Sequence, residues 1–173
     1  MDFFWKILIL GDKGIGKTSL LERYITKSFP EDGPTPYRGK ESKTTTLSLD
    51  EKKIKLEIWD PSTPNLAFYR GAHGLIMTYD CGNKATLEPL TTRAAEMEKY
   101  KPLNSLPKAI VGLKKDVADT VTEEDVKEWI AKNKVTGEDW IQVKVCTKTG
   151  EGVEELFAEL IKKVKVSAED GEN

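Results

Sequence analysis

The strongest constraint on this chain is the stretch GDKGIGKTS (residues 11–19), which directly follows the apolar, β-prone run FFWKILIL (residues 3–10). The stretch matches the pattern G-x-x-x-x-G-K-[ST] with Gly11, Gly16, Lys17 and Thr18. Gly14 and Gly16 let the backbone fold around an anion, so that successive N–H groups point inward. Lys17 reaches terminal phosphates, the Thr18 hydroxyl can ligate Mg²⁺, and the following helix adds the positive end of its dipole. The stretch therefore predicts a phosphate-binding loop between a buried strand and a helix.

The rest of the chain alternates strand-like and helix-like segments. We expect strands at residues 3–10, 43–50, 53–60, 74–80, 108–113 and 140–145, and helices at 17–27, 85–101, 122–134 and 152–166. The short turn around DEKK makes the second and third strands antiparallel neighbours. The pattern predicts an α/β fold: an open, mostly parallel six-stranded sheet with helices on both faces and ligands at the carboxyl ends of the strands.

Length and composition limit the classes of protein. With 173 residues and 38% apolar content we expect one domain, residues 1–166, followed by a flexible acidic tail, residues 167–173. The 27 basic and 29 acidic residues nearly balance, so nucleic acid is not an expected partner. Cys81 and Cys146 are expected to be buried, reduced thiols, which is typical of a cytoplasmic protein.

The sequence gives no reason to expect direct membrane insertion. The apolar run at residues 3–10 is short and interrupted by Lys6, and no stretch approaches the roughly 20 apolar residues of a membrane helix. The last residues, SAEDGEN, carry no prenylation cysteine. Peripheral membrane association is expected only if a lipidated tail has been removed or a partner recruits the protein.

A phosphate loop does not determine which nucleotide base is bound, because adenine-nucleotide kinases and guanine-nucleotide switches share it. The fifth strand ends in AIVGLKKD and the sixth in VKVCTKTG. Here the chain resembles the Ras superfamily of small GTPases, whose signatures are N-K-x-D and S-A-K, and within it the Rab family. The segments that look like Rab are GDKGIGKTSLLERY, KIKLEIWD, YRGAHGLIMTYD and GVEELF, with YRGAH the most specific. The resemblance implies a three-layer small-GTPase fold, GTP or GDP bound with Mg²⁺, and protein effectors or regulators.

The resemblance assigns roles at the base. Asp116 matches the carboxylate that pairs with the guanine ring N–H and 2-amino group, and Lys114 matches the lysine that covers base and sugar. Leu113 stands where the family has asparagine, whose loss weakens binding by about 1–3 kcal/mol. Phe29 occupies the place of an aromatic edge against the base, or else is a core residue. The nucleotide-binding residues expected from motif and resemblance together are Lys13, Gly14, Ile15, Gly16, Lys17, Thr18, Ser19, Phe29, Lys114, Asp116, Thr147 and Lys148.

The segment WDPSTPN departs from the family's W-D-T-A-G-Q. Asp60 keeps the carboxylate that holds Mg²⁺ through water, but Thr63 stands at the glycine and Pro64 at the water-orienting glutamine. Proline has neither an amide side chain nor an N–H, so it cannot position water. The chain from Asp60 to Arg70 is also several residues shorter than in a Rab, which predicts a shortened second switch.

The first switch is altered as well. The family's metal-binding threonine falls on Pro36 when counted from Thr18 and on Tyr37 when counted back from Asp60, and Thr35 is adjacent. The expected metal ligands are therefore Thr18, Asp60 and Thr35, and the groups assigned to catalysis are Lys17 and Asp60. Lys13 either supplies charge beside the γ-phosphate or points to solvent.

Three functions follow, in this order. The first is a Rab-like guanine-nucleotide-binding protein with weak GTP hydrolysis, acting as a switch or interaction module in vesicle traffic. The second is a pseudo-GTPase scaffold that binds GDP constitutively or binds no nucleotide. The third is a small P-loop kinase, which would need a lid and several arginines around a second phosphate. The sequence shows no lid insertion, and its arginines are scattered: Arg23, Arg38, Arg70 and Arg93.

Overall fold

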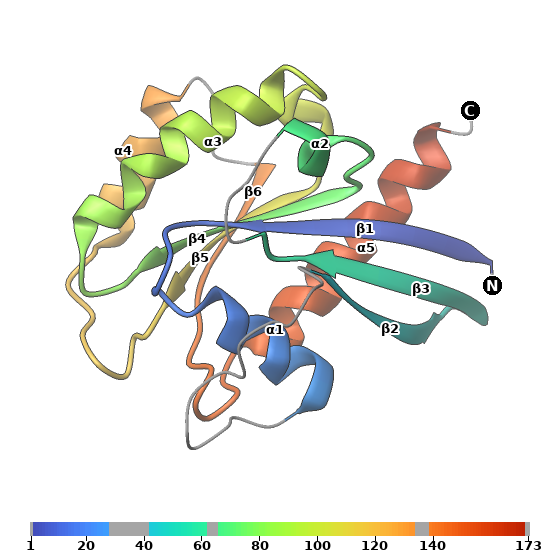
Figure 1. The fold of residues 1–173 in the computed structure, drawn as a ribbon, viewed down its shortest axis with the longest axis horizontal. Helices are drawn as coiled ribbons and strands as arrows, with labels where there is room; N and C mark the ends of the chain where they lie inside the picture. Colours follow the sequence, from blue (N-terminus) through green and yellow to red (C-terminus); the bar gives the residue numbers. More distant parts are fainter. Residues whose placement is uncertain (1, 28–41, 62–65, 134–138, 172–173) are drawn as a thin grey trace.

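A computed structural model describes residues 2–27, 42–61, 66–133 and 139–171. Its centre is a six-stranded sheet with the strand order β2-β3-β1-β4-β5-β6 (Figure 1). Only the β2–β3 pair is antiparallel, and the other four pairs are parallel. The strands are β1 (Phe3–Leu10), β2 (Ser42–Leu49), β3 (Lys52–Trp59), β4 (Gly74–Asp80), β5 (Lys108–Leu113) and β6 (Trp140–Lys144).

The β2–β3 hairpin turns over two residues, Asp50 and Glu51, which have φ angles of 50° and 65°. Two successive left-handed residues match the right-handed twist of an antiparallel pair. The strands β4 and β5 in the middle of the sheet are mostly apolar and are buried almost throughout, because helices cover both faces.

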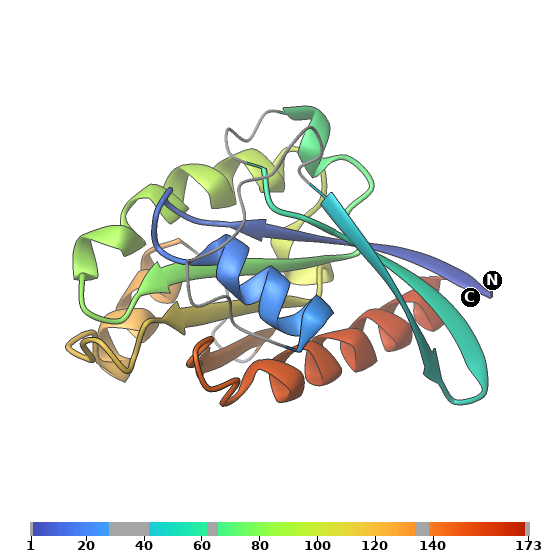
Figure 2. The same ribbon diagram turned by 60° about the horizontal axis from the view of Figure 1, so that its bottom comes forward.

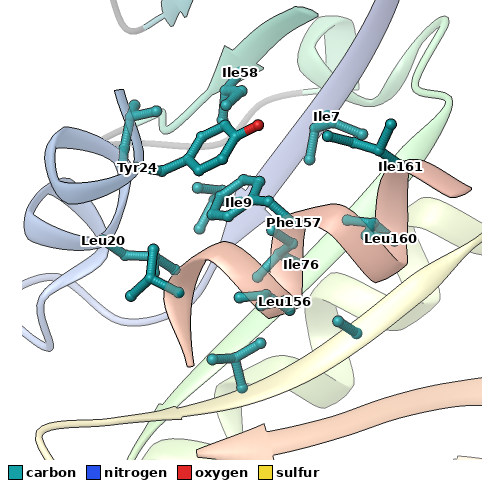
Figure 3. Close-up of a cluster of buried hydrophobic side chains, with 14 of the residues drawn as sticks. Ile7, Ile9, Leu20, Tyr24, Ile58, Ile76, Leu156, Phe157, Leu160 and Ile161 are labelled. Atoms are coloured by element: carbon teal, nitrogen blue, oxygen red, sulfur yellow. The ribbon is translucent and has the colours of Figure 1, made fainter. Parts of the chain in front are cut away.

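The helices lie in two layers (Figures 1 and 2). Helices α1 (Lys17–Thr26) and α5 (Val153–Gly171) cover one face, where the rings of Tyr24 and Phe157 stack with centroids 3.8 Å apart (Figure 3). Helices α3 (Pro89–Glu98) and α4 (Glu123–Lys132) contribute to the apolar cluster on the other face. Three short helices complete the described chain: α2 (Leu66–Tyr69), η1 (Lys84–Leu87) and η2 (Leu103–Ser105).

The fold expected from the sequence is confirmed: the sheet is mostly parallel and helices pack on both faces. Helix α4 begins where expected, because Thr122 and Asp125 form a reciprocal capping box. Helix α3 differs from the single helix expected at residues 85–101. The segment first forms the η1 turn, and the α-helix begins at Pro89, where a missing N–H costs nothing.

Helix α5 extends into residues 167–173, the segment expected to be a flexible tail. The helix continues to Gly171, five residues beyond the expected end at Val166. Lys165 supports this last part of the helix, because it pairs with Glu169 one turn later at 3.6 Å and with Asp50 of the β2–β3 turn. Glu169, one of the acidic residues of this segment, is thus part of a helix and pairs with Lys165.

Cys81 and Cys146 are both buried and free, as expected. Burial raises the pKa of the Cys81 thiol to about 11. Among the residues that the structure describes, no helix has the length and apolar character needed to cross a membrane.

Candidate functional site

Three loops meet at the edge of the sheet where the parallel strands end. We call them the phosphate loop (residues 11–16, after β1), the base loop (residues 114–119, after β5) and the third loop (residues 146–152, after β6). Asp60 follows β3 at the same edge, because β1 and β3 run parallel with Leu8 beside Trp59. In an open α/β sheet this edge is the usual place of a ligand.

The phosphate loop needs its glycines for two reasons. A Cβ at Gly11 would lie 2.1 Å from Oγ1 of Thr78, whose hydroxyl donates a hydrogen bond to the Leu10 carbonyl at 2.8 Å. Gly14 and Gly16 have φ angles of 84° and 108°, in the left-handed region that side chains rarely adopt. The loop therefore has the backbone shape that the sequence motif requires, and α1 begins directly after Gly16.

The side chain of Lys17, the first residue of α1, reaches back into the phosphate loop. Its ammonium group donates a hydrogen bond to the Gly11 carbonyl at 2.6 Å and lies 3.9 Å from the Asp60 carboxylate. Burial lowers the pKa of Lys17, the charge of Asp60 opposes that change, and the charge of Arg93 adds to it. Lys17 is thus a nearly buried cation that a phosphate group would stabilise.

Thr18 and Asp60 form the candidate metal site. The Thr18 hydroxyl donates a hydrogen bond to Oδ2 of Asp60 at 2.8 Å, and only 4% of Asp60 is exposed. A hydroxyl and a carboxylate are the hard oxygen ligands that Mg²⁺ prefers, and Mg²⁺ completes its shell with water and phosphate oxygens. The described residues therefore fit Mg²⁺ bound together with a nucleotide.

The base loop is tied to the phosphate loop by Lys114. Its ammonium group donates a hydrogen bond to the Gly14 carbonyl at 2.8 Å, and its backbone is left-handed, with φ 61°. Asp116 is exposed two residues further on. Leu113, at the asparagine position, is fully buried in one apolar cluster with Ile15, and a Cβ at Gly16 would lie 3.8 Å from its Cδ1. Apolar packing thus takes the place that a polar tether has in the resembled family.

The third loop is fixed to α1 and to the base loop. Arg23 of α1 donates hydrogen bonds to the carbonyls of Thr149 at 2.9 Å and Lys148 at 3.4 Å. Lys115 pairs with Glu151 at 2.9 Å, which connects the base loop to the third loop. In this loop the Lys148 side chain is exposed and Thr147 is half-buried, and their predicted roles at the base stay predictions.

The remaining expected site residues fall into two groups. Ile15 and Ser19 are buried, whereas Lys13 is exposed. Phe29, Thr35, Pro36, Tyr37, Thr63 and Pro64 lie outside the described residues, so their predicted roles stay predictions. The described part of the second switch contains only the four-residue helix α2.

Sequence reasoning missed three positively charged residues of this region. Arg23 and Lys115 position loops through the contacts above, and Arg93 of α3 lies close enough to Lys17 to act on its pKa. Lys115 occupies only the variable place of the segment LKKD, and the four arginines are scattered along the sequence. Only the fold brings them to the same edge of the sheet.

Comparison with known proteins agrees with this geometry. The family model described as "Ras family" matches residues 6–166. Ras-related protein Rab-1 of Theileria parva is 32% identical over 95% of this chain and 76% of its own length. Ras-related protein Rab-18 of Lymnaea stagnalis is 34% identical over 92% of this chain and 79% of its own length. Ras-related protein Rab-1D of Dictyostelium discoideum is 34% identical over 95% of this chain and 81% of its own length. The chain therefore belongs to the Ras family of small GTPases and is close to its Rab members.

Proposed function

We propose that the protein is a Rab-like guanine-nucleotide-binding protein that binds GTP or GDP together with Mg²⁺ and hydrolyses GTP slowly. The main observation in support is that the phosphate loop and the base loop are joined by a hydrogen bond. The phosphate loop, with buried Lys17 and the Thr18–Asp60 pair, is hydrogen-bonded through Lys114 to the loop that presents Asp116. A nucleotide needs both halves, one for its phosphates and one for its base.

The residues of the base loop favour guanine. Asp116 is a hydrogen-bond acceptor, and guanine offers it the ring N–H and the 2-amino group. Adenine would turn a lone pair toward the carboxylate and offers no 2-amino donor. The aliphatic stem of Lys114, whose ammonium group is bound to the Gly14 carbonyl, would cover the base and the sugar. A backbone N–H at Thr147 or Lys148 would donate a hydrogen bond to the guanine oxygen.

The phosphate loop supplies charge rather than covalent chemistry. Lys17 is the point charge for the terminal phosphates, and α1 directs its positive end toward them. Thr18 and Asp60 would hold Mg²⁺, which neutralises phosphate charge when bound. We assign the transfer step to Lys17 and Asp60, and we keep Thr35 as a third metal ligand.

A pseudo-GTPase scaffold is the second candidate, and buried Leu113 favours it. Leucine packs where the family has a base-binding asparagine, so one base contact is lost while the loop stays in place. Such a protein would hold GDP constitutively, or no nucleotide, and act only through its surface. The two candidates share a fold and differ in whether bound GTP is turned over.

The cellular role is proposed from the family. The Rab names of the relatives support a switch or interaction module in vesicle traffic, with protein effectors or regulators as partners. We propose a cytoplasmic location, with membrane association through a lipidated tail or a recruiting partner.

Titration of fluorescent GDP and ADP in the presence of Mg²⁺ tests the nucleotide assignment. We expect GDP to bind and ADP not to bind, and Asp116→Ala to reduce this preference. Lys17→Ala should weaken GDP binding strongly, because a buried phosphate-binding charge is lost. Equal affinity for GDP and ADP would contradict the guanine assignment, and unchanged GDP binding by Lys17→Ala would contradict the phosphate loop. Chromatography of nucleotide released from the denatured protein gives an independent readout.

A further inference from the structure

A small pocket lies where α2 meets the chain that follows α3 (Figure 1). Its volume is about 190 Å³, and its walls come from residues 69–73 and from Tyr100 and Lys101. Sites for drug-sized ligands usually measure about 300–1,000 Å³, so this pocket suits a small ion or a single charged group. It is separate from the phosphate loop, because His73 pairs with Lys6 of β1, and the five residues from Lys6 to Gly11 span about 16 Å.

The pocket is lined by three basic side chains, those of Arg70, His73 and Lys101. None of the described residues that line it is acidic. The ion pairs within the described part of the chain involve neither Arg70 nor Lys101. Basic groups that gather in a hollow without a carboxylate favour the binding of an anion.

His73 has a defined tautomer in this pocket. Its Nδ1 accepts a hydrogen bond from the Lys6 backbone N–H at 2.9 Å, so the neutral ring carries its proton on Nε2 as a donor. Two cations face the ring, Lys6 from β1 and Lys101 from the chain after α3. Burial lowers the pKa of His73, and the charges of Lys101 and Lys6 lower it further. An anion in the pocket would offset this repulsion.

The walls of the pocket are held in place by the surrounding fold. The Lys6 ammonium group donates a hydrogen bond to the Arg70 carbonyl at 3.0 Å, which ties the loop after α2 to β1. Tyr69 is fully buried, stacks on Tyr100 with centroids 6.1 Å apart, and donates its hydroxyl hydrogen bond to Glu96. Because the backbone is already positioned, an ion binds without first ordering a loop.

We propose that this pocket binds a phosphate dianion, either as the free ion or as a phosphate monoester, at a place separate from the nucleotide. The planar guanidinium fork of Arg70 suits two phosphate oxygens, and Lys101 adds a point charge. The Nε2–H group of His73 supplies a further donor without needing a charge. A dianion offsets this group of cations better than a carboxylate, which carries one charge.

The single histidine of the chain makes a direct test possible, because NMR of its imidazole C–H groups reports on this pocket alone. Inorganic phosphate, glycerol phosphate and acetate are titrated at about pH 8, where unbound His73 is neutral, and at constant ionic strength, so that screening does not change. Phosphate should shift the His73 resonances until they saturate, and it should raise the pKa of His73. Saturation by glycerol phosphate at a similar concentration would show that a monoester is a ligand too. An equal response to acetate would overturn the assignment to phosphate.

Substitutions at the basic residues locate the ion. Arg70→Gln should weaken phosphate binding about 10-fold, the size of one charge-assisted hydrogen bond, and it keeps the backbone carbonyl that Lys6 binds. Lys101→Gln should have a similar effect, and Arg70→Lys should bind with intermediate affinity. Lys99→Gln is the matched control, since it removes an exposed cation two residues before Lys101 that does not line the pocket.

Three results would contradict the inference. The His73 resonances could fail to respond to phosphate, or Arg70→Gln and Lys101→Gln could bind phosphate as well as the unaltered protein does. In the third case, Lys17→Ala abolishes the response, which would place the ion in the phosphate loop; we expect the response to persist in that variant. The measurement needs no nucleotide, so the proposed function can fail while this inference stands, and the reverse.

Discussion

The Thr18 hydroxyl donates a hydrogen bond to Oδ2 of Asp60 at 2.8 Å, joining residues that are 42 positions apart. The bond connects the first turn of α1 to the end of β3, so phosphate loop and second switch meet at one carboxylate. Lys17 lies 3.9 Å from the other oxygen of Asp60 and offsets its charge. The protein thus organises the ligands expected for Mg²⁺ from two separate elements.

The Thr18→Ala variant should lose the dependence of nucleotide binding on Mg²⁺. In the unaltered protein, EDTA should speed GDP dissociation, because Mg²⁺ links the phosphates to Thr18 and Asp60. The variant lacks the hydroxyl ligand, so its dissociation should already be fast and EDTA should add little. Thr18→Ser keeps the hydroxyl and serves as control. A variant whose GDP release still accelerates with EDTA as much as that of the unaltered protein would remove Thr18 from the metal site.

The Leu113→Asn variant should separate binding from stability. Asparagine restores a base contact, so GDP should dissociate more slowly, with a gain of at most about 1–3 kcal/mol. Leu113 is fully buried in the apolar cluster around Ile15, so the nucleotide-free protein should lose about 2–5 kcal/mol in free energy of unfolding. Stopped-flow dissociation and urea unfolding measure the two effects.

Leu113→Met is the matched control, because it keeps the volume and the apolar character and should change both quantities little. If Leu113→Asn releases GDP as fast as the unaltered protein, the missing asparagine contact has been replaced by other groups, with the Lys114 bond to Gly14 as the first candidate.

The single histidine should make stability depend on pH. His73 accepts a hydrogen bond from the Lys6 backbone N–H at its Nδ1, over 2.9 Å, which requires that nitrogen to be unprotonated. Burial lowers the pKa of His73, and the charges of Lys101 and Lys6 lower it further. Below about pH 6.5 the unfolded chain therefore binds a proton that the folded chain does not.

The free energy of unfolding should be fully retained above that pH and fall as the pH drops through the lowered pKa of His73. His73→Asn keeps a hydrogen-bond acceptor without a titrating group, so its urea unfolding should vary less over the same window. The chain has no other histidine to obscure the comparison. An identical pH profile in the two proteins would show that His73 is not the group that titrates.

The fold and the phosphate half of the site could be predicted from the sequence because they depend on local patterns. One motif, residues 11–18, determines the loop, the start of the following helix and the position of the lysine charge. The apolar strand segments and their order along the chain determine the sheet. The pairing of Arg93 and Tyr69 with Glu96 could not be predicted, since α2 and α3 come together only in the folded chain. The helical extension to Gly171 depends in part on a contact of Lys165 with Asp50, 115 residues away.

Hydrolysis should be slow even if every proposed phosphate contact is correct. In Ras-type proteins the unassisted rate is about 10⁻⁴ per second, and acceleration needs a glutamine that orients water and an added arginine. This chain has Pro64 at the glutamine position and a second switch whose described helix has four residues. Lys17 and Asp60 would act on phosphate charge, but neither would orient the attacking water, and positioning is the other large term in phosphoryl transfer.

The single-turnover rate of phosphate release from bound GTP should therefore not exceed the unassisted Ras-type range. Pro64→Gln should rescue it little, because Pro61, Ser62 and Thr63 also differ from the family pattern W-D-T-A-G-Q. A rate tens of fold higher would mean that another group places the water. Lys13→Ala and Asn65→Ala would then identify it: loss of the excess rate in one variant, with GDP affinity unchanged, assigns the missing role to that residue.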